Sequence, residues 1–430
     1  MRIRLDIPIY LSEITGRIDD TVVEYLSTDT REMSAGDLFI PIEGKRFNGK
    51  SFVSEARSSG AIVIDSDDGT LTLLKIAALY KSKLTSLKYT IGITGSVGKT
   101  TAKEFIYKIA SQKFRAHKTK ENENNIIGVA KTILEAPKDT EALILEVGTN
   151  HIGEIKRIVD VIPMDISLIT NIGTSHIGNF GSRDAITKEK LSIQGGGSLI
   201  TRYEDSLSGF KFSSKNTDAD LYIEKVDNRL LIYKFGKQIC DTTCAFSESH
   251  LIEEVAGAVS VCVAMSLKRE EINLGISSLS YENTRQKIIK LKNITILSDC
   301  YNASLESFSA AFNTVSWMKE FPVYSAIIGD IDELCEMSND IHRRLGAMLV
   351  GYNFRKIYAL GDMNEYVKHG YSDARGDDGR LKLLDHKKPL SDIADEIIRD
   401  SVQGEIILFK ASRKMRLELL IDEIKRRCEA

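Results

Sequence analysis

The sequence is poor in the residues that cross-link or interrupt a protein chain. Its 430 residues include six cysteines, six prolines and a single tryptophan. The cysteines are scattered and form no C-x-x-C pair, so neither a disulfide framework nor a zinc knuckle is expected. We therefore expect reduced thiols, as in the cytoplasm. The few prolines leave no low-complexity linker.

Long apolar runs and an excess of positive charge are also missing. No run reaches the roughly 18 residues of a membrane-spanning helix, and the first residues lack the apolar region of a secretory signal. The net charge of −3 argues against a general nucleic-acid binder, whose domain is usually strongly basic. With 42% hydrophobic and 28% charged residues the chain has a globular composition, and its length predicts about two to four domains.

Apolar runs of strand length alternate with helical patterns over most of the chain. After a first unit of short strands and turns, which ends in a helix predicted over 70–84, two series of strands follow. They are predicted at 89–94, 141–148 and 165–173, and then at 294–299, 324–330, 356–362 and 405–412. Such alternation is typical of mostly parallel sheets with helices on both faces, where ligands bind at the carboxyl ends of the strands. We place domain boundaries near residues 85 and 290.

The segment GITGSVGKTT, residues 92–101, looks like a phosphate-binding loop with a shortened front. The common pattern G-x-x-x-x-G-K-[ST] would need a glycine at Ile93. The segment nevertheless joins a predicted strand to a predicted helix, so backbone N–H groups and the helix dipole can face an anion. Lys99 would then reach the outer phosphates of a nucleotide, and the Thr100 hydroxyl would bind Mg²⁺. The alternative is a tight glycine turn with an incidental lysine.

The loop TGSVGKTT resembles the ATP-binding loop of the Mur ligases, the ATP-dependent amide-forming enzymes of cell-wall peptide assembly. Further segments follow in the order of that family. They are STDTREMSAGDLFIPIEGKRFNGKSF (27–52), NENNIIGV (122–129), LEVGTNHIGEI (145–155), TNIGTSHIGNFGS (170–182), SDCYNAS (298–304), GDIDEL (329–334) and KASR (410–413). Within the family they are most similar to the members that add D-alanyl-D-alanine to a UDP-N-acetylmuramoyl tripeptide.

This resemblance implies an α/β protein of three domains. They are a small α/β N-terminal domain that binds the UDP-sugar peptide (1–85), a central P-loop ATPase-like domain with a mostly parallel sheet (86–290) and a C-terminal Rossmann-like domain (291–430). It also implies an ATP- and Mg²⁺-dependent carboxylate–amine ligase that forms ADP and acts through an acyl phosphate. We expect a cytoplasmic monomer with small-molecule substrates and without nucleic-acid or membrane partners.

The resemblance further implies roles for individual residues. The nucleotide is expected on Gly95, Ser96, Val97, Gly98, Lys99, Thr100, Thr101, Arg285, Asp299 and Asn302. Two Mg²⁺ sites are expected on Thr100, Glu146, His176 and a carbamylated Lys190, with Lys99, His176 and Lys190 taking part in catalysis. The substrates are expected on Thr30, Arg31, Asp37, Gly44, Asn124 and Asn125 for the donor and on Lys410, Ser412 and Arg413 for the acceptor side.

Several of these residues have simpler alternative roles. Glu146 and Asp299 could be solvated carboxylates at strand ends, and a lone histidine such as His176 is usually structural. Composition alone makes TKEK (187–190) a charged helix face. In the family, the modified lysine begins a K-x-x-I segment, a register that Lys190 has and Lys188 lacks. We expect His151 only at the wall of the site.

The chain also departs from the family pattern beside the adenine and the substrate. The H-N-x-x-N element is here SHLIEEVAGA (249–258), which keeps His250 but has Leu251 and Glu254 in place of the two asparagines. Altered substrates therefore stay open as alternatives, for example those of archaeal pseudomurein peptide ligases or of folylpolyglutamate- or cyanophycin-type ligases. Another alternative is a catalytically inactive paralogue that binds nucleotide.

Overall fold

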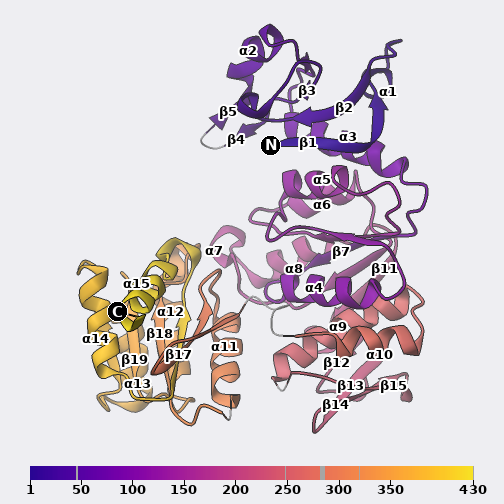
Figure 1. The fold of residues 1–430 in the computed structure, drawn as a ribbon. Helices are drawn as coiled ribbons and strands as arrows, with labels where there is room; N and C mark the ends of the chain where they lie inside the picture. Colours follow the sequence, from indigo (N-terminus) through magenta and orange to yellow (C-terminus); the bar gives the residue numbers. More distant parts are fainter. Residues whose placement is uncertain (45–46, 247, 281–285, 319, 430) are drawn as a thin grey trace.

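The computed structural model describes the chain apart from residues 45–46, 247, 281–285, 319 and 430, and shows three α/β units in sequence order (Figure 1). The first has a four-stranded sheet in the order β1-β2-β3-β6 and a separate β4-β5 ribbon. Its strands are β1 (Arg2–Tyr10), β2 (Val22–Ser27), β3 (Leu38–Phe39), β4 (Glu43–Gly44), β5 (Phe47–Asn48) and β6 (Ile62–Val63). Its helices are α1 (Leu11–Thr15), α2 (Val53–Ser58) and α3 (Gly69–Ser82), with 3-10 turns η1 (Thr30–Glu32) and η2 (Gly49–Phe52).

The second unit has a nine-stranded sheet in the order β15-β14-β13-β12-β11-β10-β7-β9-β8. The strands from β8 to β13 are parallel, as predicted, whereas β13, β14 and β15 form an antiparallel extension that we did not predict. The strands are β7 (Tyr89–Thr94), β8 (Ala116–Lys118), β9 (Ala142–Glu146), β10 (Ile166–Ile169), β11 (Ser198–Arg202), β12 (Phe210–Ser213), β13 (Leu221–Val226), β14 (Arg229–Lys234) and β15 (Lys237–Thr243).

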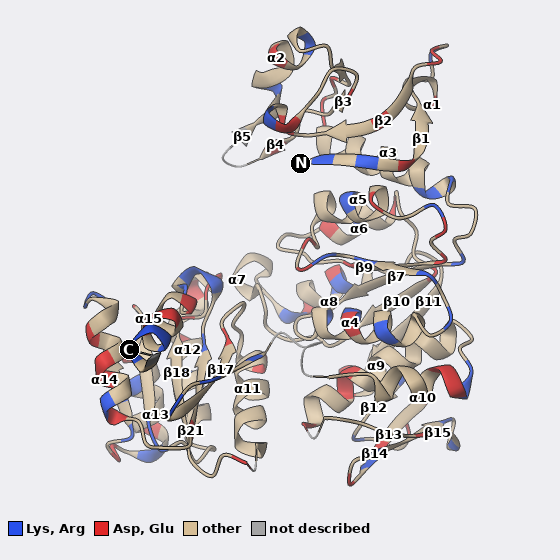
Figure 2. Cartoon of the chain, viewed as in Figure 1, with Lys and Arg blue, Asp and Glu red and all other residues tan. Residues whose placement is uncertain are grey.

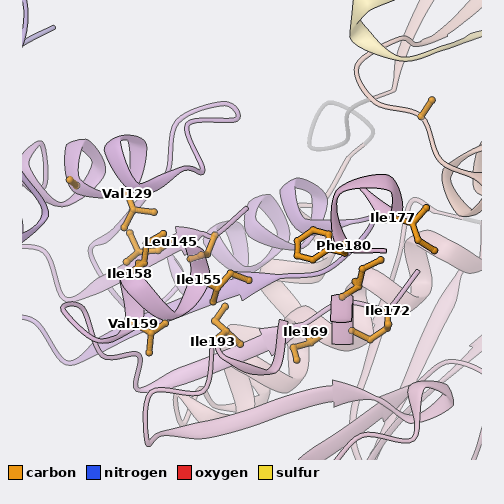
Figure 3. Packing of buried hydrophobic residues seen from close by; sticks show 14 of the residues in the cluster. Val129, Leu145, Ile155, Ile158, Val159, Ile169, Ile172, Ile177, Phe180 and Ile193 are labelled. Atoms are coloured by element: carbon orange, nitrogen blue, oxygen red, sulfur yellow. The ribbon is translucent and has the colours of Figure 1, made fainter. Parts of the chain in front are cut away.

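Helices cover both faces of this sheet because alternate strand residues point to opposite sides. Ile91 and Ile93 of β7 belong to the same apolar cluster as helices α4, α9 and α10, while Leu143 and Leu145 of β9 belong to the cluster of α5, α6 and α8. Figure 3 shows part of the second cluster, with Leu145 near Ile155 and Ile158. The helices are α4 (Lys99–Ala110), α5 (Ile126–Leu134), α6 (Glu154–Val159), α7 (Ile177–Phe180), α8 (Arg183–Leu191), α9 (Ser249–Ala264) and α10 (Arg269–Ser277), with a 3-10 turn η3 (Tyr203–Asp205).

The third unit has a six-stranded sheet in the order β16-β17-β21-β18-β19-β20, parallel except for β16. Its strands are β16 (Lys287–Lys290), β17 (Ile294–Asp299), β18 (Tyr324–Gly329), β19 (Ile357–Leu360), β20 (Leu381–Leu384) and β21 (Glu405–Lys410). Its helices are α11 (Leu305–Trp317), α12 (Ser338–Leu349), α13 (Asn364–Arg375), α14 (Leu390–Asp400) and α15 (Glu418–Glu429), with 3-10 turns η5 (Cys335–Met337) and η6 (Arg413–Met415). Because β16 already pairs with β17, this sheet starts just before the predicted boundary at 290, whose position stays a prediction.

Three helices beside the expected site begin at side chains that favour helix starts. Asn125 accepts a hydrogen bond from the backbone N–H of Gly128 at the start of α5, Ser182 does the same for α8, and Ser304 for α11. Such caps satisfy N–H groups that have no partner inside the helix. They fix where each helix begins, and so the positions of the loops that precede them.

The first two units share a buried seam, where α3 packs on α5. The Tyr80 hydroxyl on α3 donates to the carbonyl oxygen of Ala136 at 2.7 Å, and the Lys138 N–H donates to the Asp6 carboxylate at 2.7 Å. The second and third units meet at α7, which lies between their ribbons in Figure 1. A methyl group on Gly178 of α7 would come within 2.4 Å of the Glu333 carbonyl oxygen, so this approach depends on glycine.

Charged side chains of both signs are interspersed along the outer helices of the third unit (Figure 2). Among the residues that the structure describes, no helix is long and apolar enough to cross a membrane. All six cysteines are free, and four of them are buried.

Candidate active site

The glycine-rich segment forms a tight loop between β7 and α4. Gly95 has φ +151° and Gly98 has φ +85°, conformations that side chains rarely adopt. A methyl group on Gly95 would come within 1.9 Å of the Thr170 hydroxyl. The loop thus leads from the carboxyl end of a central strand into the N-terminus of a twelve-residue helix, where an anion is stabilised by N–H groups and the helix dipole.

The segment after β10 holds the loop in place. Asn171 contributes its carbonyl oxygen to the Ser96 N–H at 3.1 Å and its side-chain oxygen to the Val97 N–H at 3.1 Å. The Thr170 hydroxyl and the Asn171 amide both donate to the Val97 carbonyl oxygen. The Gly173 N–H donates to the Ser96 hydroxyl at 2.8 Å. These bonds fix the loop before any ligand binds.

Glu146 faces the phosphate loop, as predicted from its position at the end of β9. Its carboxylate is fully buried and accepts the Thr100 hydroxyl at 2.9 Å and the Asn124 amide at 2.9 Å. The ammonium group of Lys103, also fully buried, lies 3.5 Å away and donates to the Glu121 carbonyl oxygen. The alternative of a solvated strand-end carboxylate is therefore wrong for Glu146. Lys99 donates to the Gly95 carbonyl oxygen at 2.6 Å.

His176 lies at the start of α7 with a left-handed backbone, φ +62°. Its Nδ1 contacts the carboxylate of Glu333, which comes from the third unit. The histidine side chain keeps 20% of its surface exposed. The expected metal ligand therefore lies where the second and third units meet, and the contact with Glu333 orients its ring.

The two lysines of α8 have opposite environments. Lys190 is buried with 3% of its surface exposed, and Lys188 is exposed. Burial and the nearby positive charge of Lys99 hold the pKa of Lys190 well below its usual value, although the Glu189 carboxylate opposes this shift. Glu189 itself accepts N–H groups of Gly153 at 2.6 Å and Ile155 at 2.9 Å, so it caps α6. Of the two lysines, only Lys190 is thus buried, and its carbamylation stays a prediction.

A cleft of about 550 Å³ separates the second and third units beside the phosphate loop. Asp299, Asn302 and Lys410 line it from the third unit. Lys410 is buried and donates to the Asp299 carboxylate at 2.9 Å and to the Asn302 carbonyl oxygen at 3.1 Å. We expected Lys410 on the acceptor side, but the structure places it with the two residues expected at the nucleotide. Arg285 lies outside the described residues.

The remaining acceptor-side residues lie next to this group. Ser412 is buried and its hydroxyl accepts the Asp332 N–H at 2.8 Å, which connects the KASR and GDIDEL segments. Arg413 is exposed, pairs with Glu418 and has its guanidinium 5.7 Å from the centre of the Tyr301 ring. The structure thus brings the C-terminal motifs together, while their contact with an acceptor stays a prediction.

The expected donor residues are distributed over the first two units. Thr30, Arg31 and Gly44 lie on η1 and β4, where Arg31 is exposed and paired with Asp29. Asp37 is buried and already paired with Arg2 at 2.7 Å, which gives it a role within the fold. None of these four lines the nucleotide cleft. His151, expected at the wall of the site, is exposed.

Sequence reasoning missed several residues of this site. Lys103 lies beside Glu146, Asn171 binds the phosphate loop, and Glu306 accepts the Thr174 N–H behind that loop. We gave none of the three a role. Glu333 was inside the quoted segment GDIDEL, although we gave it no role. The available signals were position within a motif for Glu333 and Asn171, and helical spacing from Lys99 for Lys103.

Comparisons with known proteins show which family the chain resembles. The family model described as "Mur ligase middle domain" matches residues 93–215, and that described as "Mur ligase family, catalytic domain" matches residues 22–90. A UDP-N-acetylmuramoyl-tripeptide–D-alanyl-D-alanine ligase of Bacillus subtilis is 29% identical over 94% of both chains. A crystal structure of MurF from Acinetobacter baumannii, 25% identical, superposes with a TM-score of 0.85 over 99% of this chain and 100% of that one.

A pseudomurein peptide ligase type C from Methanothermus fervidus shares only the fold. It is 13% identical with a TM-score of 0.63, and covers 90% of this chain and 94% of its own. The chain belongs to the Mur ligase family. Its similarity to D-alanyl-D-alanine-adding members extends over nearly the whole length, which confirms the expected family and the α/β fold of three domains.

Proposed function

We propose that the protein is an ATP-dependent, ADP-forming peptide ligase that adds D-alanyl-D-alanine to a UDP-N-acetylmuramoyl tripeptide. The observation that carries this proposal is the phosphate loop with Thr100 hydrogen-bonded to Glu146, beside a cleft between two units. It lies in a chain that matches a ligase of this kind over 94% of both sequences. The reaction serves the synthesis of peptidoglycan precursors.

The proposed chemistry activates a carboxylate in two steps. The donor carboxylate attacks the γ-phosphorus of ATP, which releases ADP and leaves an acyl phosphate. The amine of the acceptor then attacks the acyl carbon, phosphate leaves, and the amine loses a proton as the amide forms. Both reactants of the first step are anions, so positive charge must bring them together. Lys99 at the helix N-terminus supplies such charge, and the loop N–H groups orient the phosphates.

The residues around Glu146 fit a Mg²⁺ ion. Mg²⁺ usually keeps several waters and binds one or two carboxylates together with substrate phosphates, so a protein site needs few ligands. Thr100 and Glu146 offer a hydroxyl and a carboxylate at the outer end of the phosphate loop. When bound, the ion would neutralise phosphate charge and polarise the phosphoryl group. His176 is proposed for a second ion.

We propose a carbamate on Lys190 for the same second site. The amine of Lys190 would attack CO₂, form a C–N bond and release a proton, which turns a cation into an anion. This reaction needs the neutral amine, and burial and the charge of Lys99 favour that form because they lower the pKa of Lys190. An uncharged or negative side chain is also better suited than an ammonium group to a site next to Lys99.

The substrate contacts proposed from the sequence remain Thr30, Arg31, Asp37, Gly44, Asn124 and Asn125 for the donor, and Lys410, Ser412 and Arg413 for the acceptor side. The position of Asn124 supports its assignment to the donor site. Its amide donates to Glu146, close to where we expect the donor carboxylate to meet the γ-phosphate. We propose a cytoplasmic location, consistent with ATP use and with free cysteines. We also propose that the protein acts as a monomer, because a single chain supplies all the residues assigned to the site.

A panel of donors and acceptors tests the proposed function. Phosphate release should require a UDP-N-acetylmuramoyl tripeptide and be strongly stimulated by D-alanyl-D-alanine. Activity with folates, with cyanophycin-type substrates or with UDP-linked pseudomurein peptides instead would identify another ligase of this fold. Nucleotide binding without phosphate release, whichever donor and acceptor are added, would favour the inactive paralogue.

A further inference from the structure

A carboxylic acid lies directly against the phosphate loop. Glu254 on α9, which we expected beside the adenine, lines the nucleotide cleft together with Gly98 and Lys99. A methyl group on Gly98 would come within 1.7 Å of Glu254 Oε1, so the carboxyl group packs on the loop backbone where a polyphosphate would bind. An ionised carboxylate here would repel the phosphates and oppose the loop's attraction for anions.

The charges around Glu254 do not neutralise it by a direct contact. Arg202 on β11 is 3.2 Å from the Glu204 carboxylate and 3.3 Å from that of Glu253. Lys99 is turned toward carbonyl oxygens of its own loop. Among the residues that the structure describes, Glu254 has no hydrogen bond or ion pair, so its carboxyl group is available to a ligand in the cleft.

The same surroundings favour the protonated acid. Burial in the cleft wall and the adjacent Glu253 carboxylate raise the pKa of Glu254 to about 8, against the opposing charges of Arg202 and Lys99. The described part of the cleft wall also carries His250 and Lys215 from the second unit, and Asp299, Glu306, Arg344 and Lys410 from the third. Burial lowers the pKa of His250, so this histidine is neutral at neutral pH and does not add a compensating positive charge.

We propose that Glu254 binds the nucleotide in its protonated form, with its carboxyl O–H donating a hydrogen bond to an oxygen of the phosphate chain. This inference rests on the proposed nucleotide site. A neutral carboxyl group can face phosphate without repulsion, as an amide side chain can. Ionised Glu254 both loses its donor and gains a charge of the wrong sign, so nucleotide binding is linked to uptake of a proton.

The test compares Mg·ADP affinity of the full chain and of Glu254→Gln between pH 6.5 and 9.5. Glutamine has nearly the same shape but cannot ionise, and both proteins share every other titrating group. Below pH 7 the ratio of the two dissociation constants should be constant. Above about pH 8 the wild-type protein should lose affinity relative to the variant by about tenfold per pH unit. A constant ratio over the whole range would overturn the proposal.

Two further measurements keep the result unambiguous. Titration of the wild-type protein in buffers of different ionisation heat should show more proton uptake on Mg·ADP binding at pH 8.5 than at pH 6.5, whether or not the variant folds. Equal uptake at the two pH values would contradict the proposal.

Magnesium pyrophosphate should show the same pH-dependent difference in affinity between the wild-type protein and the variant. A difference confined to ADP would overturn the assignment to the phosphate chain. If the wild-type protein bound no ADP, the nucleotide site itself would be wrong.

Discussion

Glu146 has partners with different consequences for mutation, among them Thr100 in the site and the buried Lys103 behind it. Replacing Glu146 by alanine would leave the Lys103 charge without this partner, and breaking a buried pair costs about 3–5 kcal/mol. Glu146→Gln keeps the shape and should be better tolerated. We expect Glu146→Gln and Lys99→Ala each to lower kcat by about a hundredfold or more, the effect of losing a major electrostatic stabiliser.

Assays of ADP production and thermal unfolding check this expectation together. Glu146→Gln and Lys99→Ala should both keep the far-UV circular dichroism spectrum of the folded protein. Glu146→Ala should unfold at a lower temperature than Glu146→Gln. Near-normal ADP production by Lys99→Ala would contradict the assignment of the loop to ATP.

Lys190 and Lys188 form a matched pair for testing the carbamate, because they lie two residues apart on one helix with opposite exposure. Lys190→Ala should lose most activity, and a small added carboxylic acid should restore part of it by supplying an anion in the vacated space. Lys188→Ala should behave like the wild-type protein. An inactive Lys188 variant beside an active Lys190 variant would show that the assigned register is wrong.

At the scale of elements, contiguous patterns were sufficient for the phosphate loop and for seven strands, which are β7, β9, β10, β17, β18, β19 and β21. The runs at 89–94 and 294–299 are β7 and β17, and the helix predicted over 70–84 is α3. The hairpins of β13 to β15 were missed because their turns, at Asp227-Asn228 and Phe235-Gly236, lack the Asn-Gly or Asp-Gly pairs that mark such turns.

In the site, too, residues close together in sequence could be predicted, and contacts between distant residues could not. Lys99, Thr100 and the loop glycines are neighbours in sequence, and Glu146 follows a recognisable apolar strand. By contrast, His176 and Glu333 are separated by 157 positions, and Thr174 and Glu306 by 132. Such contacts depend on how two domains pack against each other, which hydrophobic periodicity does not determine. The contact of Lys410 with Asp299 joins β21 to β17 within one sheet across 111 positions, and hydrophobic periodicity does not determine that pairing either.

The contact between α11 and the segment after β10 predicts an effect on domain closure. Glu306, at the start of α11, accepts hydrogen bonds from the Thr174 N–H at 2.9 Å and from its hydroxyl at 3.1 Å. Hydrogen bonds to a charged group contribute about 1.5–3 kcal/mol, so Glu306→Ala should shift the balance toward separated domains by about ten- to a hundredfold. We expect a larger radius of gyration in small-angle scattering and a lower kcat/KM for ATP.

Asp373→Ala provides the control for this variant, because Asp373 is an exposed acidic residue on α13 of the same domain. It should change neither the scattering nor the kinetics. If Glu306→Ala has the dimensions and the kcat/KM of the wild-type protein, the contact does not hold the two domains together.

At the scale of the whole molecule, the two junctions between domains differ in kind. Buried apolar residues of α3 and α5, among them Leu73, Ile76 and Ile133, join the first domain to the second. The same apolar cluster also includes Ile331 and Leu334 of the third domain, but a cleft of about 550 Å³ with many polar residues lies between the second and third. We therefore expect the first two domains to unfold together, and the third to unfold separately when no nucleotide is bound.

Tyr80→Phe tests this expectation, since it removes only the hydroxyl that donates to the buried Ala136 carbonyl oxygen across the first junction. Leaving that acceptor without a partner should destabilise the joined pair of domains by about 1–3 kcal/mol. Tyr25→Phe is the control: it keeps the aromatic ring that the Arg2 guanidinium covers at 4.2 Å and should have little effect.

Trp317, the single tryptophan, ends α11 in the third domain, so its fluorescence in urea reports on that domain alone. The circular dichroism transition of Tyr80→Phe should move to lower urea, while the Trp317 transition should not move. A shift of both by the same amount would mean that all three domains unfold as one unit, because a loss of stability at one junction can reach a distant probe only through cooperative unfolding.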